Sequence, residues 1–504
     1  MVFPVVGGTQ DTSYEIENSL RPGGGDNHHL SMVYSSAASD ANRRKFTFSG
    51  WIKLGQADHY STSYDNDRYL LSSTDASAST TSIGYGYTAA DFHLYDGRSG
   101  TYIYTTSKFR DPSAWYHLVV KYDSTQSTAS DRIFIYVNGE SQPLAYSNSG
   151  DPEVDLNTAV DFFSAGDDVD ATSADSGNFV HNVNGYMNSG FGAAAGGFDG
   201  YFADWYLLDG QALAPTEFAE TNDNGVWVPK KYTGTFNSHS FHLEFKQTGS
   251  SANSSGIGAD TSGQDNHFKV GVNSTLAAVD ITTDTPTNNF AVANPLGSNA
   301  SAFAEGNTKT TGDTGTSYSL GASSSIGFKS GKWYMEFKVS DVGNNTYIGL
   351  MKEGNDKSVN ADYQYPLGNL FYRHDGDKVT GSGSGFGVDT TYGDSFTDND
   401  IIGVAADMDN RNLYFYKNGT IQNSGTAAFT SSLISSTAGS SIEDDTYYFF
   451  FTAGYNDSIL FHNYGQPSFS ISSGNTDANG YGNFEYSVPS GYYALCTKNL
   501  AEYG

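Results

Sequence analysis

The stretch GDSFTDNDIIGVAADMDNRNLYFYKNG, residues 393–419, decides the fold of the second half of this chain. Residues 401–406 are apolar at both sets of alternating positions, so a strand formed here has two apolar faces. Residues 407–412 are polar and suit a turn, and residues 413–416 then resume the apolar run. The stretch therefore predicts a β-hairpin, and a strand that is apolar on both faces belongs inside a two-layer sandwich.

Three other segments and this hairpin follow one another in the order and with the approximate spacing found in a known family. They are GKWYMEFKV at 331–339, IGL at 348–350 and YYFFFTAG at 447–454. With the hairpin they resemble a SPRY domain over residues 318–464. The resemblance implies a bent antiparallel β-sandwich that binds protein or glycan partners through its loops and normally has no enzymatic activity. In the first segment Trp333 alternates with Met335 and Phe337, which predicts that Trp333 lies in the core.

A second sandwich is predicted between residues 46 and 220. Its strand segments are FTFSGWIKLG at 46–55, AWYHLVVKYD at 114–123, RIFIYVNGE at 132–140 and DGYFADWYLLDGQALAPTEF at 199–218. These segments resemble a laminin-G-like domain of the concanavalin A-like superfamily, including the short helical turn after the last strand. The resemblance implies a jelly-roll sandwich, whose relatives often bind sugars on the concave face or rim, sometimes with calcium.

Length and composition agree with two β domains. The 504 residues exceed one ordinary domain, and aromatics make up 14% of them, with 36 Tyr and 32 Phe. We therefore predict an all-β chain of two antiparallel jelly-roll or β-sandwich domains, concanavalin A-like and then SPRY-like, joined by a polar β-rich connector. The predicted parts are an N-terminal arm or attachment segment (1–35), the first sandwich (36–224), the connector (225–311) and the second sandwich with a C-terminal extension (312–504).

The charge limits the classes of partner. The chain has 26 basic and 56 acidic residues, a formal charge of −30, which argues against nucleic acid or anionic lipid as the main partner. No apolar run approaches the roughly 20 residues of a membrane span, so we expect no membrane insertion. The start lacks the pattern of a signal peptide, which favours synthesis in a host cytoplasm. The lone Cys496 rules out a disulfide framework within one chain.

A large disulfide-free β protein built like an adhesin suggests a virion, assembled inside a cell and released by lysis. VGGTQDTSYEIENSL near the start, IGADTSGQDNHF at 257–268, TPTNNFAVANP at 285–295 and GYYALCTKNL near the end resemble tail and fibre proteins of marine bacteriophages. We therefore expect a structural virion protein, a tail fibre or appendage subunit that contacts other virion proteins and attaches to a host-surface glycan or protein. Such subunits are usually trimers. Two alternatives stay open, a glycan-degrading tail-associated hydrolase and a capsid decoration protein.

Aromatic side chains supply the candidate binding site. Exposed tyrosines beside Asp, Asn or Arg form a platform on which sugar rings stack and make hydrogen bonds. The candidates in the first sandwich are Tyr60, Tyr64, Asp67, Arg68, Tyr95 and Tyr102, with Tyr85 and Tyr87 in the same cluster. The competing interpretation is that half of these tyrosines pack between strands.

Acidic residues give weaker candidates for chemistry. Glycosidase relatives of the first sandwich need acids that alternate along one strand, and the only such trio is Asp151, Glu153 and Asp155. Pro152 interrupts that trio in a predicted loop, so we expect no enzyme. The carboxylates of Asp167, Asp168 and Asp170 are candidates for calcium, and no other cofactor is expected. The neighbouring His28 and His29 are expected to be exposed rather than to bind a metal.

Overall fold

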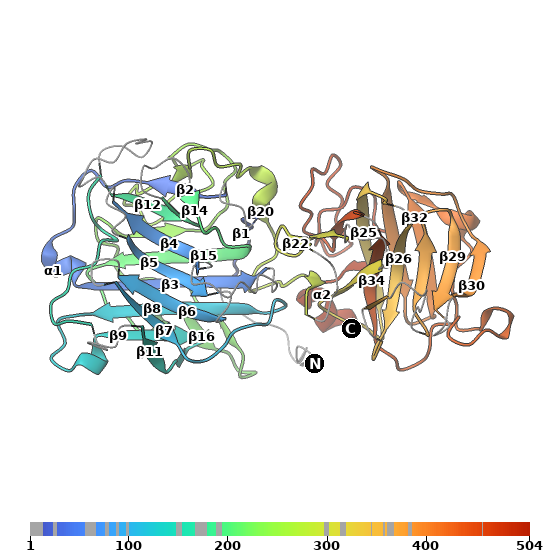
Figure 1. Cartoon of the computed structure of the whole chain (residues 1–504), viewed down its shortest axis with the longest axis horizontal. Coiled ribbons are helices and arrows are strands. Elements are labelled where there is room, and N and C mark those ends of the chain that lie inside the picture. The colour runs from blue at the N-terminus through green and yellow to red at the C-terminus, as the bar shows by residue number, and fades with distance from the viewer. Residues whose placement is uncertain are drawn as a thin grey trace. The chain divides into compact units, whose positions relative to one another are not determined.

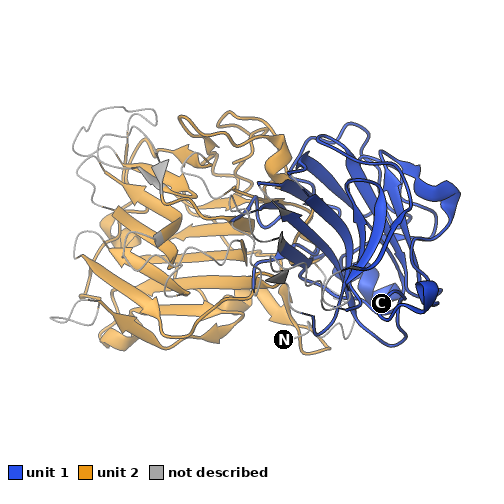
Figure 2. Ribbon diagram, turned by 45° about the vertical axis from the view of Figure 1, so that its right-hand side comes forward, with its two compact units in different colours: residues 1–9, 288–504 blue, residues 10–287 orange. Residues whose placement is uncertain are grey.

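The computed structural model describes residues 14–23, 28–55, 67–75, 80–86, 90–96, 100–147, 154–166, 179–187, 194–296, 302–312, 319–343, 345–355, 358–359, 367–381, 386–455 and 457–504. The chain divides into two compact units (Figure 2). Residues 10–287, orange in Figure 2, are called the first unit because they come first in the chain, and the unit that contains residues 288–504, blue in Figure 2, is called the second.

The first unit is a sandwich of two antiparallel sheets (Figure 1). One sheet has the order β10 (Glu140–Ser141), β9 (Ile133–Val137), β8 (Trp115–Asp123), β3 (Lys45–Leu54), β15 (Gly200–Asp209), β1 (Ser19–Leu20) and β20 (Ile281–Thr282), with β18 (Phe241–Leu243) also on β15. The other has the order β11 (Leu144–Tyr146), β7 (Thr101–Thr105), β6 (Asp91–Asp96), β5 (Thr80–Gly86), β4 (Asp67–Thr74), β12 (Val180–Val183), β2 (Leu30–Met32) and β19 (Lys269–Val270).

Alternation along the strands builds the core between these sheets. Phe46, Phe48 and Ile52 of β3 meet Ile83 of β5 and Leu94 of β6 in one buried apolar cluster. Successive side chains of a strand point to opposite faces, so the residues between these positions lie on the outer faces of the sheets. The outer faces therefore carry the polar and aromatic residues that alternate with the core positions.

The second unit is also a two-sheet sandwich. One sheet has the order β21 (Ala293–Asn294), β24 (Ser319–Ser324), β34 (Tyr448–Tyr455), β26 (Asn345–Lys352), β28 (Leu370–Arg373), β29 (Asp377–Gly381) and β30 (Phe386–Thr391), with β27 (Ser358–Val359) on β24. The other has the order β22 (Ala302–Ala304), β23 (Lys309–Thr311), β35 (Ile459–Asn463), β25 (Lys332–Asp341), β31 (Ile401–Asp407), β32 (Asn412–Lys417) and β33 (Thr420–Ile421), with β36 (Tyr493–Ala494) on β25. The β25–β36 pair is parallel.

The hairpin predicted from residues 393–419 is confirmed. Strands β31 and β32 pair antiparallel, with Asp407 opposite Asn412 next to the turn. Every residue of β31 is buried, as two apolar faces require. The core position of Trp333 is also confirmed, because its side chain is fully buried in the main apolar cluster of this unit.

Two segments take part in the sandwiches more than the sequence predicted. We expected residues 1–35 to form an arm, but β1 pairs with β15 and β2 pairs with β12 inside the first unit. We expected residues 225–311 to form a separate connector, but β18, β19 and β20 add to the first sandwich, and β21, β22 and β23 add to the second. Strands of two or three residues gain their stability from partners far away in sequence, so a local pattern does not reveal them.

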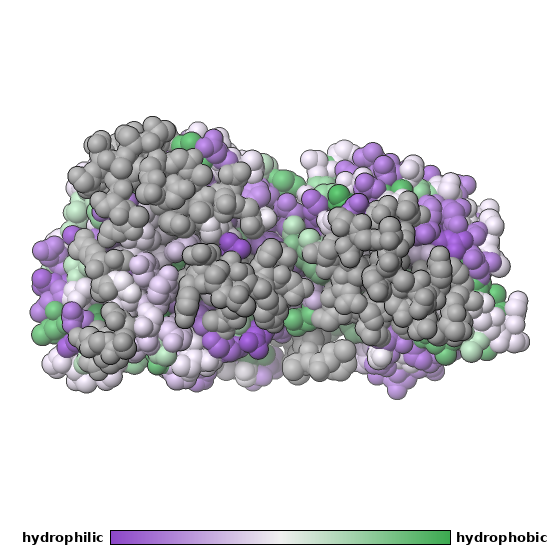
Figure 3. Space-filling view, viewed as in Figure 1, coloured by the Kyte–Doolittle hydropathy of each residue, from purple (hydrophilic) through white to green (hydrophobic). Residues whose placement is uncertain are grey.

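The remaining elements are short. They are α1 (Asp40–Arg43), α2 (Thr497–Tyr503), the 3-10 turns η2 (Ala129–Asp131), η3 (Pro215–Glu217), η4 (Ala278–Asp280), η5 (Gln422–Gly425) and η6 (Ile434–Ser436), and the two-stranded pairs β13 (Tyr186–Met187) with β14 (Ala194–Ala195) and β16 (Ala219–Thr221) with β17 (Trp227–Pro229). The structure is thus nearly all-β, as predicted, and η3 is the expected turn after the last strand of the first sandwich. Across the described residues, none of the helices has the length and apolarity to cross a membrane. On the face drawn in Figure 3, hydrophobic residues of the described surface are scattered among hydrophilic ones.

Candidate functional site

Tyr95 and Tyr102 form a closely packed, tilted aromatic pair on the outer face of a first-unit sheet. Tyr95 lies in β6 directly opposite Tyr102 in β7, with ring centroids 4.3 Å apart and planes inclined by 32°. The neighbours Leu94 and Ile103 point into the core, so alternation turns both tyrosines away from it. Both side chains are half-buried. The pair therefore offers aromatic surface to a ligand on a rigid pair of strands.

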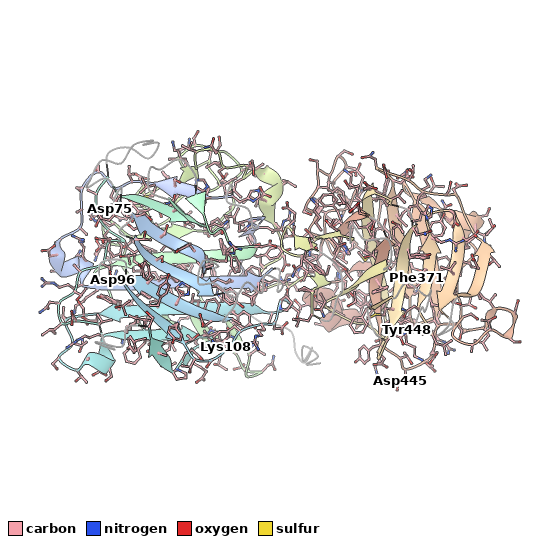
Figure 4. The ribbon with its side chains drawn as sticks, in the orientation of Figure 1. Asp75, Asp96, Lys108, Phe371, Asp445 and Tyr448 are labelled. Atoms are coloured by element: carbon pink, nitrogen blue, oxygen red, sulfur yellow. The ribbon has the colours of Figure 1, made fainter. Side chains whose placement is uncertain are left out.

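His93 extends the aromatic surface along β6. Its ring lies 5.5 Å from that of Tyr102 in an edge-on arrangement. The ring of His93 also fills the space above Gly84 of β5, where a Cβ atom would lie 2.4 Å from Nε2. A side chain at position 84 would thus displace the His93 ring. Asp96, which is labelled in Figure 4, comes directly after Tyr95 in the chain and is the last residue of β6.

A row of small polar residues continues from the tyrosine pair across the same face. Ser82 of β5 lies opposite Tyr95, and the register then runs through Ser72, Asn182 and Ser31. All four are buried. Hydrogen bonds satisfy part of the row, because Ser31 Oγ donates to Asn182 Oδ1 at 2.7 Å and Ser72 Oγ donates to the Gly185 carbonyl at 2.7 Å.

Two atoms of this polar row lack a hydrogen bond among the described residues. They are Ser82 Oγ and Asn182 Nδ2. Buried polar atoms normally have a partner, so both positions are unusual. The row is nonetheless buried, whereas Tyr95 and Tyr102 at its end keep part of their surface exposed.

The structure brings together only part of the predicted site. Tyr60, Tyr64 and Tyr87 lie outside the described residues, as does the side chain of Asp67, whose backbone begins β4. Arg68 lies opposite Tyr85, and Tyr85 belongs to the core, where its hydroxyl donates to the Phe109 carbonyl at 2.6 Å. Arg68 is therefore on the other face of the sheet from Tyr95 and Tyr102. A β-bulge between Tyr69 and Leu71 shifts this register, which sequence patterns do not show.

The acidic candidates fall mostly outside the described residues. Asp167, Asp168 and Asp170 lie there, together with Asp151 and Glu153. Asp155 is described and exposed. Within the described ranges, no three or more His, Cys, Asp or Glu side chains are arranged to hold a metal ion.

Two of the buried histidines of the first unit, His29 and His117, have clearly lowered pKa values. We expected the pair at 28–29 to be exposed, but the side chain of His29 is buried, and this burial, with the nearby His28, lowers the pKa of His29 to about 4. Burial lowers the pKa of His117 to about 3. Its Nδ1 accepts a hydrogen bond from Trp227 Nε1 at 3.1 Å, and its Nε2 lies 2.9 Å from Ser49 Oγ. His117 thus holds β17 over the sheet and has a structural role.

In the second unit, a buried carboxylate holds the C-terminal segment over a sheet. Glu336 of β25 accepts hydrogen bonds from the backbone N–H groups of Glu485 at 2.9 Å and Tyr486 at 2.8 Å. Burial raises the pKa of Glu336 to about 7 even though these hydrogen bonds favour the charged form. Phe484 then packs on Tyr334 beside Ala405 and Cys496. This face of the sheet is therefore covered by the chain's own extension.

Comparison with known proteins agrees with the two sandwiches. Residues 24–202 match the concanavalin A-like lectin/glucanases superfamily, and residues 332–461 match the SPRY domain family. The chain carries a concanavalin A-like domain followed by a SPRY domain. The Tyr95–Tyr102 pair lies within the matched part of the concanavalin A-like domain, and the Glu336 carboxylate lies within the matched part of the SPRY domain.

The solved structures that match parts of the chain are distant in sequence. The SPRY domain of human HERC1 is 17% identical, with a TM-score of 0.23, and the match covers 31% of this chain and 87% of that one. A SAP-like pentraxin from Limulus polyphemus is 15% identical, with a TM-score of 0.27 and coverage of 40% and 81%. A putative carbohydrate binding protein from Bacteroides ovatus is 14% identical, with a TM-score of 0.29 and coverage of 51% and 58%. No curated protein matches the sequence.

Proposed function

We propose that this chain is a binding protein whose concanavalin A-like domain takes a glycan on the Tyr95–Tyr102 pair. The observation that carries the proposal is this outward-facing, half-buried pair of tyrosine rings in contact on neighbouring strands. The apolar face of a sugar ring packs on such a surface, and the polar edge of the ring is left free for hydrogen bonds. The lectin-like and SPRY folds, which suit binding, support the same conclusion.

The charge of the chain narrows the class of glycan. With a formal charge of −30, the protein repels polyanions at low and moderate salt. A neutral polysaccharide or oligosaccharide therefore suits the surface better than a sulfated or uronic-acid polymer. In this proposal the protein binds the glycan and does not cleave it.

We place this activity in the virion of a bacteriophage, in a tail fibre or another external appendage that attaches to a host surface. The resemblance of four sequence segments to tail and fibre proteins supports this setting, as does the adhesin-like architecture in a chain with one cysteine. The other partners in this setting are neighbouring virion proteins.

The first prediction concerns the tyrosine pair. On an array of neutral glycans, the full chain binds a defined subset, and Tyr95→Ala weakens binding by up to about tenfold per site because a stacking surface is lost. Tyr136→Ala is the matched control. Tyr136 is also a half-buried tyrosine in an aromatic pair, with Phe134, but it lies in β9 on the other sheet. Equal losses in the two variants would refute the assignment to Tyr95.

The full chain also tests the alternative function, that of a glycan-degrading hydrolase. We expect no release of reducing sugar ends when the full chain is incubated with a polysaccharide that it binds. The triple variant Asp151→Ala, Glu153→Ala, Asp155→Ala is expected to bind as the parent does. Release of reducing ends by the parent and its loss in the triple variant would replace the binding proposal by a glycosidase.

The second prediction is a homotrimer in solution. The end strands β10 and β33 leave sheet edges with exposed residues, and assembly protects such edges from unwanted pairing. A trimer also presents three weak sites together, which raises the strength of attachment to a surface. Mass measurement at micromolar concentration checks this, and a monomer both in solution and in the particle contradicts it.

A further inference from the structure

Lys53 and Asp284 form an ion pair in the interior of the first unit. Lys53 Nζ lies 2.7 Å from Asp284 Oδ2, and both side chains are 0% exposed. An ion pair away from water is costly, because the desolvation of two charges rivals their attraction. Two apolar residues of similar size would stabilise the fold equally well at these positions. Stability alone therefore does not explain why a charged pair is buried here.

The fold fixes both partners in place. Ile52 and Leu54 point into the core, so Lys53 between them points to the outer face of the sheet, where it lies in register with Trp115 of β8 and Tyr201 of β15. Asp284 follows β20, and two hydrogen bonds hold its backbone. Ser19 Oγ donates to its carbonyl at 2.6 Å, and its N–H donates to Thr282 Oγ1 at 3.2 Å.

The surroundings of Lys53 favour its uncharged amine. Burial lowers the pKa of Lys53, although the carboxylates of Asp284 and Asp111 act in the opposite direction. The ring of Tyr201 lies 5.3 Å from Lys53 Nζ, and Trp115 Nε1 donates to Asp284 Oδ1 at 3.2 Å. The amine is therefore held beside one carboxyl oxygen, while an N–H group contacts the other.

We propose that Lys53 and Asp284 join through an isopeptide bond that forms in the folded chain. A proton first passes from the ammonium to the carboxylate, which leaves a neutral amine beside a neutral acid. Nζ then attacks Cγ, the Nζ–Cγ bond forms and the Cγ–Oδ2 bond breaks. Oδ2 leaves as water with two of the three ammonium protons, and the third proton stays on the amide nitrogen. The reaction needs no oxidant or other reagent.

Trp115 has a positioning and polarising role in this reaction. Its N–H group contacts Oδ1, which stays behind as the amide oxygen and carries negative charge while Nζ adds to Cγ. A fixed donor at such an oxygen stabilises the developing charge. The aromatic walls exclude water, which would otherwise solvate the charged amine and carboxylate.

The bond would remove two buried charges and close a long loop. The two residues are 231 positions apart, and a cross-link over such a distance restricts the unfolded chain strongly. It joins β3 at the centre of the sheet to the last segment of the first unit. The chain would thereby gain a covalent clamp that its single cysteine does not provide.

Intact mass measurement of the denatured, reduced full chain tests the proposal. We expect the mass of the sequence less one water molecule, and a branched proteolytic peptide that contains both residue 53 and residue 284. Lys53→Arg keeps the charge but is expected to show the full sequence mass. Lys45→Arg is the matched control, because Lys45 also pairs with an aspartate, Asp123, but its own side chain is 37% exposed, and this variant is expected to keep the water loss.

Two outcomes would overturn the bond. One is a parent chain with the full sequence mass and two separate linear peptides, and the other is a water loss that persists in Lys53→Arg. If Lys53→Arg does not accumulate as folded protein, the parent's mass and its branched peptide decide the question alone.

Discussion

Trp333→Ala is expected to lower the free energy of unfolding of the SPRY domain by about 3–5 kcal/mol. The indole is 0% exposed and belongs to the largest apolar cluster of the second unit, and its truncation leaves a cavity that the surrounding strands fill only in part. The variant also loses the hydrogen bond from Trp333 Nε1 to the Ser330 carbonyl at 2.7 Å.

Leu433→Ala is the control for this variant, because Leu433 is a large apolar residue of the same unit that is 49% exposed. It is expected to change stability by less than about 1 kcal/mol. Calorimetry of the full chain follows the transition of the SPRY domain. A Trp333→Ala protein that melts within about two degrees of the parent would mean that β25 does not lie in the core.

Glu336→Ala is expected to cost about 2–5 kcal/mol, because it leaves buried hydrogen-bond donors without an acceptor. The carboxylate accepts from the backbone N–H groups of Glu485 and Tyr486, and Asn463 Nδ2 lies 3.3 Å from it. Loss of this anchor loosens the C-terminal segment. Limited proteolysis is therefore expected to cut the variant within residues 465–504 faster than the parent.

The contribution of Glu336 depends on pH with a defined sign. Burial raises its pKa from 4.5 to about 7, so the folded protein holds the proton more tightly than the unfolded chain. The stabilisation is fully present below pH 4.5 and is lost as the pH rises through 7. Relative to Glu336→Gln, which does not titrate, the parent is expected to lose up to about 3 kcal/mol between these limits.

Denaturant unfolding of the parent and of Glu336→Gln at several pH values measures this difference. The comparison cancels the other titrating groups of the chain, including the buried His462, whose pKa is lowered to about 3. A stability difference that stays constant between pH 4.5 and 8 would contradict the raised pKa of Glu336.

The sequence predicted those parts of the fold in which an apolar or alternating pattern extends over many consecutive residues. The two apolar faces of β31, the polar turn after it and the alternation around Trp333 each span enough residues to define a strand and its buried side. The same holds for β3 and β8 of the first unit, which are long and apolar. Both domain families follow from such segments.

The parts that could not be predicted depend on pairing between distant residues. Strands β1 and β20 have two residues each and are stable because they pair with each other and β1 pairs with β15. The bulge after Tyr69 places Arg68 with Tyr85 on the core side, although the sequence predicted both residues as part of the binding site. Lys53 lies in an apolar run, and its partner Asp284 is too far along the chain for a pattern to connect them.

The central claim is that this protein binds glycan through Tyr95 and Tyr102. Calorimetric titration of the full chain with the strongest ligand from the array tests it most directly, in the parent, in the double variant Tyr95→Ala, Tyr102→Ala and in Tyr136→Ala. We predict saturable binding heat for the parent and for Tyr136→Ala, and none for the double variant at the same concentrations. Binding by a folded double variant with the parent's affinity would contradict the claim.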